Sequence, residues 1–441
     1  MSNKSDVSSS RAFHPFTPGQ AMVEADRCLG CYEGPCMKAC PAHVNIPGFI
    51  KRFRDGNIEG ASDLIYDACP LGATCGTACP TQSYCEGSCV LPGMGQHAIR
   101  VGALQAFIAQ QSQKPETPAI APKPQKIAVI GGGPSGLGCA VQLVRLGYRP
   151  HLFEKRTSIG GLVDQVIPLH RLPKEPVEFD IQRIMSSGIE FHLGKEILPQ
   201  DVEDLEKEYD AIFLGIGLGD SKATPEYETD TEGVLQALDF LESDRLSRLG
   251  NAKPCEIGKK VVVVGGGNVA LDAAVIAKKA GADRVIVLYR RSKDEMPGWE
   301  SEYLEATTLG IEFRWMSIVQ DVLSEQGKLK GVVVRGMQFY SQSNDGRRQV
   351  RIDPGSRPYE LNCDSLIVAV GQSLDTQIPE AFGLDISNQG TISLPAPEER
   401  KGKIFSAGEA VTGSGTIIHS LSQGMSAGQK IHAWLESEKA Q

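Results

Sequence analysis

The hydrophobic and polar positions divide the chain into two regions of different periodicity. Between residues 23 and 113, short apolar stretches such as those at 46–53 and 99–111 recur between glycines, prolines and cysteines. Their spacing predicts short amphipathic helices. From residue 126 onwards, β-branched runs alternate with helical stretches, which is typical of an α/β layered fold. The proline-rich stretch at 114–125 has no apolar periodicity, so we expect an extended connector there.

Length and composition limit the classes of protein that the chain can represent. At about 150 residues per domain, its 441 residues predict roughly three domains. No run approaches the ~18 consecutive apolar residues of a membrane span. The net charge of −9, without a basic stripe, argues against a nucleic-acid partner. Residues 1–16 lack the apolar core of a secretory signal. We therefore expect a cytoplasmic protein whose partners are small molecules or proteins.

The cysteines indicate metal chemistry, because nine of the 12 fall between Cys28 and Cys89. Without an export signal, such clustering favours metal ligation over disulfides. The first run approximates the bacterial ferredoxin spacing, in which the last, proline-followed cysteine ligates the other cluster; it comprises Cys28, Cys31, Cys36 and Cys40. The second run comprises Cys75, Cys79, Cys85 and Cys89. Structural zinc is the competing interpretation, but it favours paired C-x2-C knuckles and ligand-spaced histidines, and only one C-x2-C occurs. The eight histidines show no ligand spacing, and most of them are expected at solvated or core positions.

A first dinucleotide-binding motif follows the β-branched stretch that begins at residue 126. Its glycines open a predicted helix, and Glu154 ends the next predicted strand. Glycines at this spacing permit a tight turn and close approach of a pyrophosphate to the helix N-terminus, while the carboxylate binds ribose hydroxyls. The candidate contacts are Gly131, Gly133, Pro134, Ser135, Gly136 and Glu154.

A second motif of the same kind has a different residue at the ribose position. It comprises Gly265, Gly267, Asn268, Val269 and Ala270, and its second strand ends in Arg290 and Arg291 instead of an acid. Two guanidinium groups suit the 2′-phosphate of NADP(H). The alternative is that they are two solvated arginines at a strand end. NADP(H) is favoured, and NAD(H) is possible.

The two motifs together resemble the pyridine nucleotide-dependent flavin reductase fold, with the second unit inserted in the first. Gly161 and Leu162 follow Glu154 as in FAD members, and residues 402–431 resemble the closing FAD motif, with Gly408 and with Glu409 where that family usually has Asp. Dithiol chemistry is not expected, since Cys139 lacks the partner cysteine of the disulfide reductases. The implied organisation is a tail (1–22), an all-α cluster domain (23–113), a linker (114–125), an α/β FAD domain (126–235 and 362–441) and an inserted NAD(P)H domain (236–361).

The full combination resembles the glutamate synthase small-subunit family, which shares its module with dihydropyrimidine dehydrogenase. This resemblance implies two 4Fe-4S clusters whose ligands cross between the runs. One takes Cys28, Cys31, Cys36 and Cys89; the other takes Cys40, Cys79, Cys85 and Gln105. Cys69 and Cys75 are then left over, and we interpret them as neighbours of the clusters in preference to ligands.

The implied activity is electron transfer from NAD(P)H through FAD and the clusters to a partner catalytic subunit, although the flow could be reversed. Hydride transfer between the cofactors needs no acid or base from the protein, so we name no catalytic side chain. A redox sensor or scaffold is one alternative, but it would not need both intact dinucleotide motifs. A stand-alone oxidoreductase is another, but no segment remains to house a substrate site.

Overall fold

The computed structural model describes residues 15–112, 123–222, 227, 230–253, 255–342, 348–395 and 400–438. Within them the chain forms two compact units. The larger unit contains residues 15–165, 169–219 and 374–438, and the smaller unit contains residues 166–168 and 220–373. Most of the predicted linker and residues 1–14 of the predicted tail lie outside the described residues. None of the helices in the described part of the chain has the length and apolar character needed to cross a lipid bilayer.

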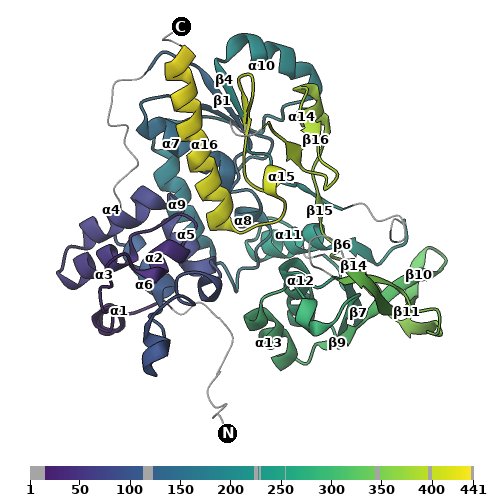
Figure 1. Ribbon diagram of the computed structural model, residues 1–441. Coiled ribbons are helices and arrows are strands. Elements are labelled where there is room, and N and C mark those ends of the chain that lie inside the picture. Colours follow the sequence, from purple (N-terminus) through teal and green to yellow (C-terminus); the bar gives the residue numbers. More distant parts are fainter. Residues whose placement is uncertain are drawn as a thin grey trace. The chain divides into compact units, whose positions relative to one another are not determined.

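The cysteine-rich part of the larger unit consists of short helices, as the sequence predicts (Figure 1). Asparagine side chains cap two of them, because Asn45 Oδ1 accepts from Gly48 N at 3.0 Å and Asn57 Oδ1 from Gly60 N at 2.8 Å. Phe49 lies on the buried face of the first of these two helices. The helices are α1 (Pro18–Asp26), α2 (Pro35–Ala39), α3 (Ile46–Arg54), α4 (Ile58–Ala68), α5 (Gly72–Ala78), η1 (Thr81–Ser83), η2 (Leu91–Met94) and α6 (Val101–Ala109).

The rest of the larger unit is built on a six-stranded sheet in the order β18-β19-β4-β1-β2-β3. All neighbouring strands are parallel except β18 and β19. The central strand β1 is buried throughout, as expected for a parallel sheet covered on both faces. The strands are β1 (Ile127–Ile130), β2 (His151–Glu154), β3 (Glu190–Leu193), β4 (Ala211–Leu214), β18 (Arg400–Lys401) and β19 (Ile404–Ser406), with a hairpin of β16 (Asp385–Ile386) and β17 (Ile392–Ser393).

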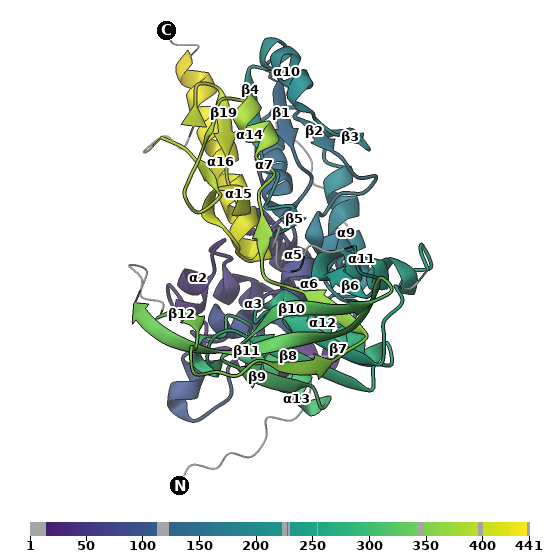
Figure 2. The same cartoon turned by 90° about the vertical axis from the view of Figure 1, so that its right-hand side faces the viewer.

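Two helices of the larger unit pack with unusually close backbones. A Cβ on Gly424 of α16 would lie 1.9 Å from Ser135 O, and a Cβ on Gly138 of α7 would lie 2.3 Å from Leu421 O. Only glycine therefore permits this approach. Both views show α7 and α16 side by side (Figures 1 and 2). The helices of this part are α7 (Pro134–Arg145), α8 (Leu162–Gln165), α9 (Lys174–Met185), η3 (Pro199–Asp201), α10 (Val202–Glu208), α14 (Gln377–Ala381), α15 (Glu409–Thr412) and α16 (Ile417–Glu438).

The smaller unit contains a parallel sheet in the order β6-β14-β7-β8-β9. Its strands are β6 (Val234–Gln236), β7 (Lys260–Val264), β8 (Arg284–Tyr289), β9 (Glu312–Trp315) and β14 (Ser365–Val368), and its helices are α11 (Ala237–Arg248), α12 (Asn268–Lys279), η4 (Lys293–Glu295) and α13 (Glu300–Thr308). This unit extends beyond the inserted segment 236–361 expected from the sequence, because β6, β14 and the pair β5 (Asp220–Ser221) and β15 (Gln372–Ser373) belong to it.

A second sheet of the smaller unit was not anticipated from the sequence. It is antiparallel and has the long strand β11 at its centre (Figure 2). Its strands are β10 (Ser317–Glu325), β11 (Lys328–Gln342), β12 (Arg348–Ile352) and β13 (Tyr359–Asn362). The register between β10 and β11 shifts at two places, and such irregularities weaken the strict alternation that reveals a strand in a sequence.

One fully buried carboxylate joins the helical and α/β parts of the larger unit. Asp180 of α9 accepts hydrogen bonds from Thr74 N at 2.8 Å, Ala73 N at 3.3 Å and the Tyr66 hydroxyl at 2.8 Å. Burial raises the pKa of Asp180 to about 6, against the opposing effect of these donors. The carboxylate thereby satisfies the first N–H groups of α5, the helix that carries Cys75.

We expect Asp180→Leu to destabilise the larger unit by about 2 kcal/mol or more, because three buried donors would lose their acceptor. Asp180→Asn is the matched control. Its amide oxygen still accepts from Thr74 N and its amide nitrogen can donate to the Tyr66 oxygen, but the Ala73 N–H loses its acceptor, so this variant should lose only part of the stability. Thermal unfolding of both variants, followed by circular dichroism, should show a clearly lower midpoint for the leucine variant. Equal midpoints for the two variants would mean that Asp180 is not the acceptor on which α5 depends.

Candidate functional site

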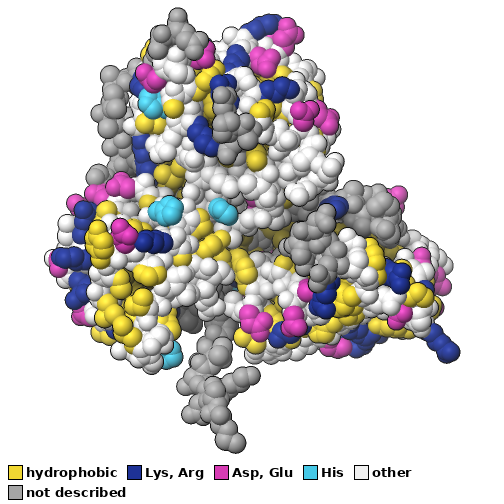
Figure 3. Space-filling view, in the orientation of Figure 1, with side chains coloured by type: hydrophobic (Ala, Val, Ile, Leu, Met, Phe, Trp, Pro, Cys, Tyr) yellow, Lys and Arg dark blue, Asp and Glu magenta, His cyan; other side chains and the backbone are white. Residues whose placement is uncertain are grey.

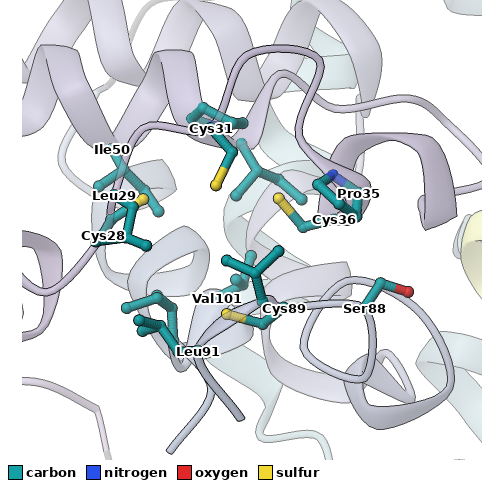
Figure 4. A pocket seen from close by; sticks show the side chains of 14 residues that line it. Cys28, Leu29, Cys31, Pro35, Cys36, Ile50, Ser88, Cys89, Leu91 and Val101 are labelled. Carbon is teal, nitrogen blue, oxygen red and sulfur yellow. The ribbon is translucent and has the colours of Figure 1, made fainter. Parts of the chain in front are cut away.

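Four cysteines drawn from both sequence runs line one cavity of the larger unit. Figure 4 shows their side chains arranged around it. Two come from the loop between α1 and α2, one from α2 and one from the loop before η2. Most of the other lining residues are apolar, among them Ile46, Ile50 and Leu91. The structure thus brings together the first predicted ligand set, Cys28, Cys31, Cys36 and Cys89.

Two thiols of this cavity, those of Cys28 and Cys36, lie in surroundings that disfavour their charged form. Burial is the largest cause of the raised pKa of Cys28, and it raises the pKa of Cys36 to about 11. The Cys89 thiol adds to both shifts. Because metals bind the thiolate, four thiolates in one cavity need a positively charged centre between them. The donor set therefore fits a four-cysteine iron–sulfur cluster.

A second cavity is lined by the other predicted ligands and by one further cysteine. Its polar lining comes from the end of α2, from α5 and its C-terminus, from the segment after η1, and from α6. Ile46 lines both cavities, so the two are adjacent. The four predicted residues in this lining are Cys40, Cys79, Cys85 and Gln105, and the fifth donor is Cys75.

Gln105 is buried and its amide orientation is fixed. Its Nε2 donates to the carbonyl oxygen of Gly72 at 2.9 Å, and 7% of the residue is exposed. The amide oxygen Oε1 is therefore the atom suited to bind a cation. Sequence reasoning from spacing gave no signal for this residue, because Gln105 lies 16 positions after the last cysteine of the second run.

Cys75 of the second cavity has a second cysteine as its partner. A hydrogen bond with the Cys69 thiol, followed by burial, raises the pKa of Cys75 well above its ordinary value. Cys69 itself is fully buried at the C-terminus of α4. This thiol pair supports the interpretation that both residues surround a cluster, which stays a prediction.

The first glycine-rich loop joins β1 to α7, and two of its glycines are required by the fold. A Cβ on Gly131, whose φ is +103°, would lie 2.5 Å from Gly215 O, and a Cβ on Gly136 would lie 1.8 Å from Gly131 O. At Gly133, the N-cap of α7, the nearest atom would be 4.0 Å away. The fold therefore leaves this position open, as a pyrophosphate cradle requires.

Glu154 lies beside that loop with its carboxylate held by the backbone. Its Oε2 accepts from Gly132 N at 2.7 Å and its Oε1 from Arg156 N at 2.9 Å, while 7% of the residue is exposed. A carboxylate accepts about four hydrogen bonds. Both oxygens therefore retain capacity for a ribose hydroxyl.

The other predicted FAD contacts converge on the N-terminus of α7. A Cβ on Gly161, which precedes Leu162 and α8, would lie 3.0 Å from the Cα of Gly133. A Cβ on Gly408 would lie 2.8 Å from the side chain of Ser135, which follows Pro134. The Ser135 hydroxyl is buried and has no hydrogen-bond partner among the described residues. Such an orphaned donor fits a bound phosphate oxygen.

Glu409 is the first residue of α15 and lies in the same region. Burial raises its pKa, and its carboxylate accepts from Gly415 N at 2.8 Å. The longer side chain thus turns back to the backbone of its own loop.

The closing FAD motif also contacts the cysteine-rich helices. Ile418 of α16 lines the second cysteine cavity. Close by, the Tyr84 and Thr416 hydroxyls lie 3.2 Å apart, and Ser422 Oγ donates to Pro41 O at 2.9 Å. The element that packs on the first glycine-rich loop therefore also forms one wall of a cysteine cavity.

The second glycine-rich loop lies in the smaller unit, between β7 and α12. A Cβ on Gly265, with φ +143°, would lie 2.2 Å from Ala369 O, whereas a Cβ on Gly267, the N-cap of α12, would meet nothing within 4 Å. Asn268 Oδ1 accepts from Trp299 N at 2.9 Å. Val269 is half-buried and Ala270 fully buried in the first turn of α12. Here too the fold leaves the middle of the loop open.

The two arginines at the end of β8 differ in their surroundings. Arg290 is exposed, whereas Arg291 is half-buried and donates from Nε to Arg348 O at 3.2 Å. Arg348 pairs with Glu295 at 3.2 Å and stacks on Phe339 at 3.7 Å. Sequence reasoning missed Arg348, because the strands β11 and β12 that bring it here were not predicted.

Two family descriptions match the chain. "Dihydropyrimidine dehydrogenase domain II, 4Fe-4S cluster" matches residues 6–117, and "pyridine nucleotide-disulphide oxidoreductase" matches residues 125–424. The second match alone covers more than half of the 441 residues. Together they confirm the predicted fold class of an iron–sulfur domain followed by an α/β oxidoreductase domain.

Similar proteins include subunits of larger enzymes. The chain is 32% identical to "Glutamate synthase [NADPH] small chain" of Escherichia coli K12, over 96% of this chain and 93% of that protein. It is 30% identical to "NAD-dependent dihydropyrimidine dehydrogenase subunit PreT" of the same organism, over 96% of each.

A solved structure, "Mycobacterium tuberculosis FprA in complex with NADPH", has a TM-score of 0.61 at 18% identity and covers 72% of this chain and 86% of that one. At this identity the likeness concerns the fold alone. The two sequence relatives match nearly end to end, and both family descriptions lie in the expected order. The chain therefore belongs to the glutamate synthase small-chain family of oxidoreductases.

Proposed function

We propose that the chain oxidises NADPH and passes the electrons through FAD and two 4Fe-4S clusters to a partner protein. The main support for this proposal is that α16 contacts both the first glycine-rich loop and the second cysteine cavity. One part of this helix packs on the first glycine-rich loop, and another part lines the second cysteine cavity. Because Ile46 lines both cavities, a continuous route runs from the flavin cradle through the second cavity to the first.

The residues proposed to hold FAD act by binding and orienting it. The N-terminus of α7 offers its free N–H groups and positive dipole end to the pyrophosphate at Gly133. Glu154 positions the ribose, and the buried Ser135 hydroxyl donates to a phosphate oxygen. Bound FAD supplies the step from two-electron nucleotide chemistry to one-electron cluster chemistry.

The proposed cluster ligands are Cys28, Cys31, Cys36 and Cys89 for the first cavity, and Cys40, Cys79, Cys85 and Gln105 for the second. In the first cavity, the thiols are only partly covered and the lining residue Leu29 is 56% exposed. Tyr32 and Met94, which are close in sequence to these ligands, are also exposed. Figure 3 shows hydrophobic side chains gathered over the cysteine-rich helices. The first cavity is therefore the proposed point from which electrons leave for a partner subunit.

The proposed choice of NADPH rests on the arginines at the end of β8. The names of two relatives differ, since one names NADPH and the other NAD. The choice of nucleotide is therefore inferred from the residues of this chain. Arg290 is exposed at the position where an acid would bind a 2′-hydroxyl. Arg291 is fixed by its bond to Arg348. A 2′-phosphate would receive charge-assisted hydrogen bonds from this pair.

The anaerobically purified chain should contain about eight iron and eight sulfide, as expected for two four-iron clusters. Cys28→Ser and Cys40→Ser should each remove about half, because each residue serves a different cavity. Cys75→Ser is the matched control: it lies in the second cavity but should retain the full content. Iron and sulfide analysis would contradict the ligand sets if the Cys75 variant lost as much iron as the Cys40 variant, or if stoichiometric zinc replaced iron.

Gly133→Val should abolish FAD binding without unfolding the larger unit. A Cβ at this position meets no protein atom closer than 4.0 Å, so the new side chain would occupy only the pyrophosphate cradle. Gly267→Val is the control, since it should weaken nucleotide binding and leave the flavin in place. Flavin released by heat denaturation should be absent for the first variant and near one FAD per chain for the second. A full FAD content in the Gly133 variant would rule out this cradle.

The double variant Arg290→Ala/Arg291→Ala should raise KM for NADPH roughly tenfold or more and leave that for NADH nearly unchanged, because one or two charge-assisted hydrogen bonds are lost. Diaphorase assays with an artificial acceptor measure both values. Arg284→Ala, at the other end of β8 and paired with Glu312 at 2.7 Å, is the control and should change neither. Equal losses with both nucleotides would show that the arginines do not read the 2′-phosphate.

A further inference from the structure

Three metal-ligating side chains meet at the edge of the six-stranded sheet, on strands that pair in parallel. In the register of β2 and β3, His151 lies opposite Glu190 and Phe153 lies opposite His192. Alternate residues of a strand point to the same face of a sheet. His151, Glu190 and His192 therefore share one face, although 39 positions separate the first from the second.

The nitrogen and oxygen atoms of these groups lie at distances that suit a common cation. His151 Nε2 lies 3.7 Å from Glu190 Oε2, and His192 Nε2 lies 3.4 Å from Glu190 Oε1. One ligand atom from each residue can be chosen so that all three lie within 4.8 Å of one another. Ligands of a tetrahedral zinc ion with bonds near 2.0–2.1 Å are about 3.4 Å apart. A small adjustment of side chains is thus enough to enclose an ion.

Neighbouring aromatic side chains hold the two imidazoles in place. The Tyr209 hydroxyl lies 3.1 Å from His151 Nδ1, and Tyr209 is 4% exposed. His192 Nε2 also lies 3.3 Å from His151 Nδ1, so the two imidazoles contact each other directly in the absence of an ion. Binding an ion requires His151 Nδ1–H to donate to the Tyr209 hydroxyl, which leaves Nε2 with the lone pair that faces Glu190. The His192 ring stacks on Phe153, with centroids 4.6 Å apart. Metal-binding histidines commonly hydrogen-bond through the ring nitrogen that does not bind the metal, as His151 can with Tyr209, and this bond fixes the tautomer and the ring orientation.

We propose that His151, Glu190 and His192 form a binding site for a divalent transition-metal ion of the zinc class, separate from the cysteine cavities. Two imidazoles and one carboxylate are a donor set that zinc accepts, and the fourth position is open to water. The Glu190 side chain is 60% exposed and that of His192 32%, so an ion can reach the site from solvent. The nearby Lys126 ammonium is paired with Glu208 at 3.1 Å, which offsets its repulsion of a cation.

Equilibrium dialysis of the anaerobically purified holoprotein against micromolar zinc chloride tests this site. Zinc and iron are both measured afterwards, so that zinc entering a damaged cluster is recognised by the loss of iron. The wild-type chain should take up about one zinc ion with its iron retained. His192→Ala should abolish this uptake. Glu190→Gln, an exposed change that does not threaten folding, should weaken zinc binding at least about tenfold.

His97→Ala is the matched control, because His97 is exposed and lies among the cysteine-rich helices; its zinc uptake should equal that of the wild type. Anomalous diffraction at the zinc edge from a soaked crystal should place the ion between β2 and β3. The proposal fails if the wild type takes up no zinc with its iron intact, or if the Glu190 and His192 variants bind zinc as the wild type does.

Discussion

The close packing of α16 on α7 is the constraint on which the arrangement of the larger unit depends. Gly424 meets Ser135 O and Gly138 meets Leu421 O at distances that exclude any side chain. This contact fixes the C-terminal helix against the first glycine-rich loop, and the same helix places Ile418 in the wall of the second cysteine cavity. A displacement of α16 would therefore change both the flavin cradle and the proposed route by which electrons leave it.

Some buried polar groups of the larger unit are satisfied by the fold itself, and others are not. Asp180 is fully buried because it satisfies the donors of α5 and Tyr66, so its role is structural. The Ser135 hydroxyl is buried without a partner among the described residues, which is unfavourable unless a ligand completes it. Burial raises the pKa values of Cys28, Cys36 and Cys40, with nearby backbone N–H groups acting in the opposite direction, whereas metal binding requires the thiolate.

The local features of the fold could be predicted from the sequence, because glycine spacing and apolar periodicity are properties of neighbouring residues. The loops at Gly131 and Gly265 and the short cysteine-rich helices are of this kind. Groupings of distant residues could not be derived in the same way. That Cys28 and Cys89 belong to the same ligand set could be predicted only from the family resemblance. The positions of Cys75 in the second cavity and of Arg348 beside Arg291 followed only from the structure. The group around His151 depends on the register of two strands, which no spacing rule contains.

Flavin is proposed to connect the nucleotide to the clusters, and electron paramagnetic resonance of the clusters is the measurement that tests this connection. The oxidised chain would be mixed anaerobically with NADPH, and the dithionite-reduced chain with NADP⁺. The test then works whether the clusters have a higher or a lower reduction potential than the nucleotide. The cluster signals of the wild type should change in at least one of these two experiments, and those of the FAD-free Gly133→Val variant should change in neither. Equal changes in the FAD-free variant, or none in the FAD-loaded wild type, would contradict the proposed connection.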